Sequence, residues 1–211
     1  MTISYDLILV ARSSSDRLKL MTQNCINSAE ADNVILIETY EPTEYEGVDN
    51  HFFYNGAFNY NHALNLGLEE AKCDVHILAN NDLIFHNYKT IGEDMMHNGF
   101  GSGSAWFKGC HFPQGDLIYP GYDIAIHLTG WCIFITKETK EIIGRLNEGV
   151  DFWYSDNLYG EQLKRYGIKH GLFCNARVDH LGSQTLNTMP VKMKRYFSIG
   201  QLPKYAKRQK I

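Results

Sequence analysis

A largely apolar run that stops at a carboxylate is the feature of this 211-residue chain that most constrains its fold. The run covers residues 75–79 and is followed directly by Asn80, Asn81 and Asp82. Its continuous apolar character indicates a parallel strand covered on both faces, because half-exposed strands alternate. Ligands of open α/β sheets bind at the carboxyl ends of the strands, where Asp82 is well placed to hold Mg²⁺ or Mn²⁺. The alternative is a strand-ending turn, which Asn and Asp also favour.

The order of the other segments predicts an α/β domain. Residues 5–11 and 33–39 are apolar enough for strands, and amphipathic segments that begin near Ser14 and Asn59 are expected to be helices. Alternation of strands and helices implies right-handed crossovers and a parallel sheet. A single domain is the default at this length, and we expect it to span residues 1–191. The glycine-rich region 99–121 predicts short strands and loops.

Neither export nor membrane insertion is expected from the sequence. No apolar run approaches the length of a membrane span, and the N-terminus lacks a basic leader with a long apolar core. Five widely spaced cysteines without a Cys-x-x-Cys pair indicate reduced thiols. We therefore expect a cytoplasmic protein.

Two blocks of the chain resemble family 2 glycosyltransferases, which have the GT-A fold. In that family a helix with an Asn-x-Gly pattern, here residues 65–67, leads into a strand that ends in an Asp-x-Asp metal motif. Asn80 replaces the first acid of the motif, so Asp82 alone offers a charged ligand. Downstream, residues 129–185 are similar to the stretch in which two aromatic residues precede an acid at a helix start and a His-x-Gly-Ser follows.

The resemblance implies a mixed, mainly parallel sheet flanked by helices. A nucleotide-sugar half would cover about residues 1–98, and an acceptor half about residues 99–191. Asp156 falls on the catalytic acid, which would act as general base, and His180 on the metal ligand that joins Asp82 in holding Mn²⁺ or Mg²⁺. The residues expected to bind the nucleotide-sugar, most simply a UDP-sugar, are Ala11, Arg12, Glu38, Tyr40, Asn59, Asn65, Asn80, Asn81, Lys192, Lys194 and Arg195. Trp131, Trp153 and Tyr154 are expected to contact the acceptor.

Several of these residues have simpler interpretations. Asn59 and Asp156 could serve only as caps of helices. Glu38 could be an exposed carboxylate at a strand end. His180 is one of nine histidines, and its position before Gly182 and Ser183 is what distinguishes it.

Residues 192–211 form a basic tail. They carry seven Lys and Arg residues and no acid, and since the whole chain has a net charge of −4, residues 1–191 carry −11. The tail could close over the diphosphate, bind a polyanionic acceptor such as nucleic acid, or lie on an anionic membrane with a lipid-linked acceptor. A solvated terminus is the alternative beyond Pro203.

Our first hypothesis for the sugar acceptor is hydroxymethylated cytosine in DNA. The compact size and the basic, aromatic tail resemble small bacteriophage DNA glycosyltransferases, and such a protein would act in the host cytoplasm. A glycosyltransferase for a surface polysaccharide or a lipid-linked glycan is the first alternative. A non-catalytic nucleotide-binding domain is the second, because Asn80 removes an acid from the metal motif.

Overall fold

The computed structural model describes residues 2–208, apart from the side chains of Ser198 and Arg208. Nine strands form one sheet of order β3-β2-β1-β4-β8-β6-β9-β5, with β7 added alongside β9. The strands are β1 (Tyr5–Ala11), β2 (Asn33–Glu38), β3 (Asn50–Phe53), β4 (Val75–Asn80), β5 (Leu83–Phe85), β6 (Ser102–Trp106), β7 (Ile118–Pro120), β8 (Cys132–Thr136) and β9 (His170–His180). The helices are α1 (Asp16–Ala29), α2 (Tyr60–Glu70), α3 (Thr90–Asn98), α4 (Lys137–Ile143), α5 (Ser155–Tyr166), α6 (Gln184–Thr188), α7 (Val191–Ser198) and α8 (Leu202–Arg208).

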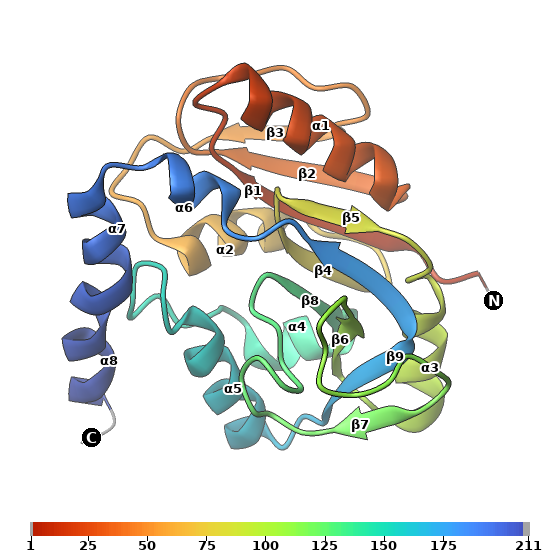
Figure 1. Cartoon of the computed structure of the whole chain (residues 1–211). Coiled ribbons are helices and arrows are strands. Elements are labelled where there is room, and N and C mark those ends of the chain that lie inside the picture. Colours follow the sequence, from red (N-terminus) through yellow and green to blue (C-terminus); the bar gives the residue numbers. More distant parts are fainter. Residues whose placement is uncertain (1, 209–211) are drawn as a thin grey trace.

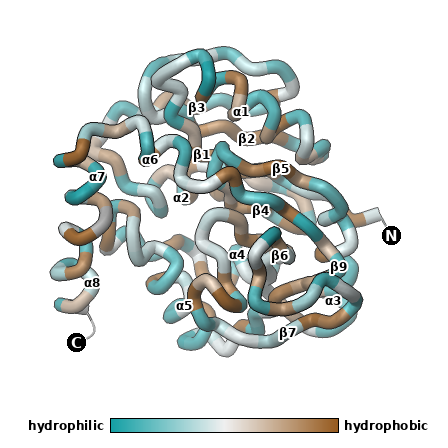
Figure 2. Tube along the Cα trace, in the orientation of Figure 1, coloured by the Kyte–Doolittle hydropathy of each residue, from teal (hydrophilic) through white to brown (hydrophobic). Residues whose placement is uncertain are grey.

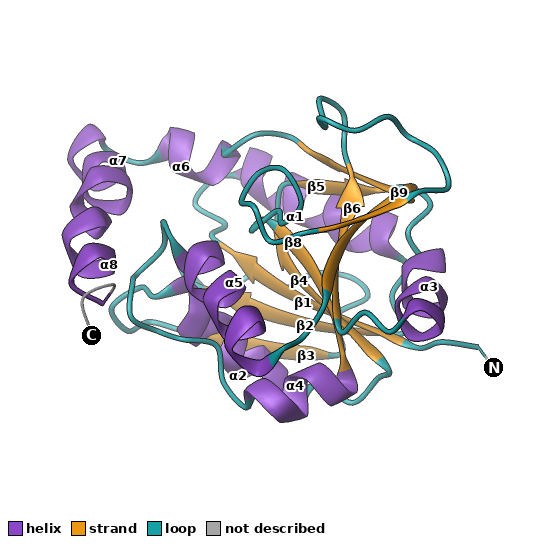
Figure 3. Ribbon diagram, turned by 90° about the horizontal axis from the view of Figure 1, so that it is seen from below, coloured by secondary structure: helices purple, strands orange, loops and turns teal. Residues whose placement is uncertain are grey.

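The predicted mixed, mainly parallel sheet is confirmed. Strands β3, β2, β1 and β4 run parallel, β8 is antiparallel to both β4 and β6, and β6 is parallel to β9. Helices cover both faces of the sheet (Figures 1 and 3). The carboxyl ends of β1, β2 and β4 therefore meet at one edge, as the sequence predicted.

Two hydrophobic cores explain why the central strands carry apolar residues on both faces. In β1, Leu7 and Leu9 pack into the core shared with α1 and α3, whereas Ile8 and Val10 pack into the core shared with α2, α4 and α5. Alternate residues of a strand point to opposite faces, so a strand covered on both sides has no polar face. Hydrophobic segments accordingly gather in the central strands (Figure 2).

Gly67 explains the Asn-x-Gly pattern of α2. A Cβ at this position would lie 2.3 Å from Cγ2 of Ile8 on β1. Only glycine therefore lets α2 approach the sheet this closely.

The C-terminal segment forms a separate helical arm beside the sheet. After β9 the chain passes through α6 and then through α7 and α8, which stand at the edge of the molecule (Figure 1). Asp151 anchors the arm by accepting hydrogen bonds from the Lys204 ammonium at 2.7 Å and from the Tyr196 hydroxyl, while the buried Gln201 accepts one from the Asp151 amide at 2.8 Å. Residues 202–208 are thus helical rather than a solvated coil, and residues 209–211 of the predicted tail lie outside the described range. None of the helices described is long and apolar enough to cross a membrane.

Candidate functional site

A cleft lies where the carboxyl ends of the parallel strands face the C-terminal arm. It encloses about 730 Å³, part of which is open to solvent. Its lining comes from β1, the segment after β4, the start of α2, residue Phe152 and the α6–α7 region. The residues are Val10, Ala11, Arg12, Thr39, Phe58, Tyr60, Asn80, Asn81, Asp82, Phe152, Ser183, Thr185, Leu186, Met189, Met193 and Phe197.

Asp82 and His180 come together because β5 pairs with the end of β9. In that antiparallel ladder Leu83 lies opposite His180, and the amide of Leu181 donates to the carbonyl of Asp82 at 2.9 Å. Oδ2 of Asp82 accepts a hydrogen bond from the amide of Gln184 at 3.1 Å. Oδ1 of Asp82 lies 3.2 Å from Nε2 of His180.

This pair of atoms has the character of an incomplete metal site. Both atoms are buried and lie within ion-pair distance of each other, but neither has a hydrogen-bond partner among the described residues. Buried polar atoms without partners are uncommon in folded proteins. A carboxylate oxygen and an imidazole nitrogen are ordinary ligands of Mn²⁺, and Mg²⁺ is commonly held by one or two carboxylates with phosphates and water. The residues present therefore fit a divalent cation.

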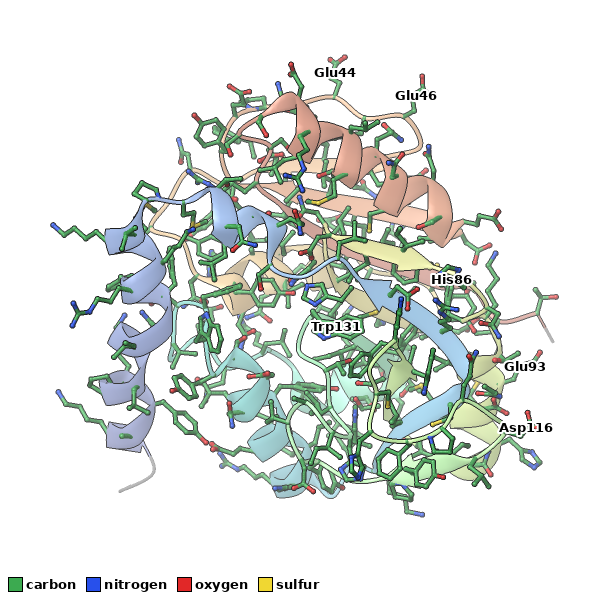
Figure 4. The ribbon with its side chains drawn as sticks, viewed as in Figure 1. Glu44, Glu46, His86, Glu93, Asp116 and Trp131 are labelled. Carbon is green, nitrogen blue, oxygen red and sulfur yellow. The ribbon has the colours of Figure 1, made fainter. Side chains whose placement is uncertain are left out.

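The protein supplies only part of such a coordination shell. No group of three or more His, Cys, Asp or Glu side chains that could hold a metal occurs within residues 2–208. Trp131, labelled in Figure 4, stacks on His180 with the ring centroids 5.0 Å apart and orients the imidazole. The carbonyl of Trp131 accepts from the amide of Asn80, so the ring is tied to the strand that presents Asp82. Trp131 thus supports the Asp82–His180 pair, and its predicted contact with the acceptor stays a prediction.

Asp156 occupies the first turn of α5, as the sequence suggested. Its Oδ1 accepts a hydrogen bond from the amide of Asn157 at 2.9 Å, and its carboxylate lies against Gly130, which precedes β8. Burial raises the pKa of Asp156, and the amide hydrogen bonds only partly offset this effect. A carboxylate with a raised pKa is a stronger base once it is ionised.

Tyr60 connects Asp156 with the cleft. Asp156 lines a second, smaller cavity of about 230 Å³, and Tyr60 lines both that cavity and the cleft. The Tyr60 hydroxyl is buried and has no hydrogen-bond partner within the described chain. Burial raises the pKa of Tyr60, and the charges of Cys132, Asp82 and Asp156 raise it further. Nothing in the sequence singles out Tyr60 beyond its position after the helix cap Asn59.

Four of the residues predicted to bind the nucleotide-sugar line the cleft, namely Ala11, Arg12, Asn80 and Asn81. Tyr40 lies next to it, with its ring 4.7 Å from the Arg12 guanidinium carbon. Glu38 is fully buried rather than exposed, and its Oε1 accepts hydrogen bonds from the amides of Ser13, Thr39 and Tyr40. Its Oε2 finds no partner in the described part of the chain. Glu38 therefore holds the loops beside the cleft through Oε1, and its Oε2 can still accept a hydrogen bond.

The structure places Asn59 and Asn65 away from the cleft lining. The Asn59 side chain caps α2 through the amide of His62 and donates to the carbonyls of Glu148 and Val150. Asn65 is buried and bonds the amide and carbonyl of Leu146 together with the Glu148 carboxylate. Both amides hold the 146–150 loop, and their predicted contact with the donor stays a prediction.

The predicted basic contacts are also outside the cleft lining. Lys192 and Arg195 are exposed on α7, and the ammonium of Lys194 donates to the carbonyl of Asn187 at 2.8 Å. The α7 residues that do line the cleft are Met193 and Phe197. Phe197 makes an edge contact with Phe58 at 5.6 Å between centroids. The sequence analysis did not predict this apolar lining, because it considered mainly the basic residues of the tail.

The aromatic pair before Asp156 is split between two environments. Trp153 is exposed, whereas the Tyr154 ring stacks on Tyr205 of α8 at 5.0 Å. Tyr154 has a left-handed φ of 71°, an uncommon conformation for a non-glycine residue, directly before α5. The exposed Trp153 ring is the member of the pair open to a ligand, and both acceptor contacts stay predictions.

Comparison with known proteins identifies the fold class of this chain. No protein-family model matches the sequence, and no curated protein does. Among the matching solved structures is a crystal structure of GalNAc-T7 with UDP, GalNAc and Mn²⁺, with a TM-score of 0.63 at 13% identity over 85% of this chain. This chain spans 43% of that structure's length. The predicted fold class is confirmed as a GT-A-like glycosyltransferase fold.

Proposed function

We propose that this protein is a metal-dependent glycosyltransferase that moves a sugar from a nucleotide-sugar, most simply a UDP-sugar, to an acceptor hydroxyl. The observation that carries the proposal is the pair of Asp82 Oδ1 and His180 Nε2, two buried atoms without a hydrogen-bond partner in the described chain that lie 3.2 Å apart, with Asp82 in the lining of the cleft at the strand ends. The GT-A-like fold supports it, and GalNAc-T7, which shares that fold, was solved with UDP and Mn²⁺.

The chain's own residues would bind and orient the donor. Asp82 and His180 would hold Mn²⁺ or Mg²⁺, which when bound supplies positive charge opposite a leaving diphosphate. Arg12 is the cationic side chain among the described cleft residues and can donate hydrogen bonds to phosphate oxygens. The side chains of Asn80 and Asn81 add amide groups at the end of β4. The apolar side chains of α6 and α7 would exclude water from the donor.

Asp156 would take the proton of the acceptor hydroxyl. A hydroxyl is a weak nucleophile, and a positioned carboxylate raises its reactivity by removing the proton as the bond forms. Burial already raises the pKa of Asp156, which brings its basicity closer to the working pH. Tyr60 lies between this carboxylate and the cleft and can orient a sugar there.

The acceptor is a separate question. The comparisons give no support to hydroxymethylated cytosine in DNA, which was the first hypothesis from the sequence, and they do not determine another acceptor. The acceptor panel should therefore contain hydroxymethylcytosine DNA, plain DNA, soluble glycans and a lipid-linked glycan.

The test is release of nucleoside diphosphate from UDP- and GDP-sugars with Mn²⁺ or Mg²⁺, with and without each acceptor. Asp82→Asn and His180→Ala should abolish the metal-dependent release and weaken Mn²⁺-dependent binding of UDP by at least about tenfold. His86→Ala is the matched control, because Nε2 of His86 also faces an aspartate, Asp179, at 3.1 Å, but Asp179 is outside the cleft lining, whereas Asp82, the aspartate that faces His180, is part of it. Binding of UDP without release from any donor would favour the non-catalytic alternative, and no nucleotide binding at all would refute the proposal.

A further inference from the structure

The outward side of the C-terminal arm carries aliphatic side chains that nothing in the described chain covers. Val191 is 80% exposed, Ile199 64% and Leu202 47%. Together with the exposed Arg195 and Ala206 they recur at intervals of three and four residues, which places them on one side of the helical arm. We call these five residues the outer face of α7–α8.

The opposite side of the same helices faces the body of the protein. Phe197 and Gln201 are buried there, and Met193 and Phe197 line the cleft. The arm therefore has two sides with apolar residues, one packed against the body of the protein and one exposed. Figure 2 shows hydrophobic and hydrophilic residues alternating along α7 and α8, and Figure 1 shows that the arm stands at the edge of the molecule.

Positive charge surrounds the outer face. Residues 191–208 contain six Lys and Arg residues and no acid, and Lys192 and Lys207 are exposed beside the outer face. The rest of the chain is acidic, so this charge is concentrated on the arm. Basic residues on an amphipathic helix are attracted to anionic lipid headgroups, and exposed aliphatic residues next to them can enter the headgroup boundary.

We propose that the outer face of α7–α8 docks this protein on an anionic lipid bilayer. Charge alone would suit DNA equally well, but Val191, Ile199 and Leu202 gain nothing from contact with phosphates and sugars. A bilayer satisfies both the charged and the aliphatic side chains. The docking itself does not depend on the proposed function.

The consequence for the acceptor does rest on the proposed function. Because opposite sides of α7 meet the bilayer and the cleft, the cleft lies about one helix diameter, roughly 10 Å, from the lipid headgroups. A lipid-linked acceptor would then be presented beside the cleft. The docking favours a lipid-linked acceptor over DNA.

The test is co-sedimentation of the full chain with phosphatidylcholine vesicles and with vesicles that also contain phosphatidylglycerol, without nucleotide. Binding to the anionic vesicles should be at least about tenfold tighter and should weaken with added salt. Ile199→Asp should weaken it by at least about tenfold. Lys192→Gln combined with Lys207→Gln should weaken it by about fivefold per residue.

Leu20→Asp is the matched control. Leu20 is 63% exposed on α1, close to the 64% of Ile199, so the two variants change the same chemistry at similar exposure. Leu20→Asp should leave vesicle binding unchanged. Thermal unfolding of both variants checks that each is folded.

Three results would overturn the docking. One is no preference of the wild-type protein for anionic vesicles. Another is DNA binding that the lysine variants abolish and Ile199→Asp leaves intact. The third is a dimer that Ile199→Asp dissociates, without vesicle binding. Nucleotide release measured without vesicles reports on the proposed function separately, so either proposal can fail alone.

Discussion

Gly130→Ala should slow sugar transfer through its effect on Asp156 alone. A Cβ at Gly130 would lie 2.6 Å from Cβ of Asp156, 2.8 Å from its Oδ2 and 3.0 Å from its Cγ. Gly130 is not among the glycines with a positive φ, so alanine brings no backbone strain. The substitution therefore acts by displacing the carboxylate.

The size of the effect follows from these distances. Carbon atoms in contact prefer about 3.5–4.0 Å, so the Asp156 side chain must move by about 1 Å. A displacement of that size in a reacting group costs about 100-fold in rate, which corresponds to about 2.7 kcal/mol in the barrier. Overpacking costs about 1–3 kcal/mol of stability, or roughly 2–4 °C in Tm for each kcal/mol at this chain length.

The assay compares turnover with donor binding. We expect kcat for nucleotide release to fall about 100-fold and the Kd of UDP with Mn²⁺ to stay unchanged, because Asp82, His180 and Arg12 are not touched. Gly115→Ala is the control, since a Cβ there meets nothing within 4 Å and Gly115 has no positive φ.

A double-mutant cycle identifies the route of the effect. Asp156→Gly removes all three atoms that the new Cβ would meet, so Gly130→Ala should cost nothing further in that background. The reasoning is refuted if Gly130→Ala keeps full activity, or if it slows the Asp156→Gly variant as much as it slows the wild-type protein.

Four further substitutions test individual groups. Burial raises the pKa of Asp156, so kcat should rise with pH through that raised value, and Asp156→Asn should abolish the rise. The same variant should raise Tm at neutral pH, because a raised folded-state pKa destabilises the ionised form, and a lower Tm would contradict this. Asp6 lies near the amino end of β1, away from the cleft, and its carboxylate takes part in four hydrogen bonds. Asp6→Ala should therefore lower the free energy of unfolding by about 3–5 kcal/mol in urea titrations. It should leave kcat unchanged. Tyr60→Phe removes an unpartnered buried hydroxyl and should leave the free energy of unfolding equal or higher, whereas Tyr159→Phe, which breaks a bond to Ser102, should lower it by about 1 kcal/mol.

Local sequence patterns predicted the first half of the fold because each of its strands and helices has a recognisable pattern of its own. The central strands are apolar on both faces and α1 and α2 have caps at Ser15 and Asn59. β6 is different, since its sequence Ser-Gly-Ser-Ala-Trp has few apolar residues. Ser102 and Ser104 are buried there because His170 bonds both hydroxyls, and this partner lies more than 60 residues away. A buried polar residue whose hydrogen-bond partner is distant in the sequence cannot be recognised from its neighbours along the chain.

The candidate site was predictable where side-chain chemistry is specialised. A carboxylate at a strand end and a histidine before a turn have few equivalents, and the β5–β9 pairing brings Asp82 and His180 together. Asparagine is less specific, because its amide serves a loop as well as a ligand, and Asn65 serves the loop. The contribution of α7 could not be predicted, since Phe197 reaches the cleft only through the anchor that Asp151 gives the arm.

If the proposed metal site holds a cation, its composition suggests how one acid can suffice where the resembling Asp-x-Asp motif has two. Asn80 removes a negative charge from the end of β4, so a cation held by Asp82 and His180 keeps more of its positive charge for a bound diphosphate. Such a two-ligand site binds a cation weakly by itself, and diphosphate oxygens must complete the shell. Linkage then requires that cation and nucleotide strengthen each other's binding by the same factor. Because Met193 and Phe197 line the same cleft, we expect the C-terminal arm to contact the bound nucleotide as well and so to contribute to this coupling.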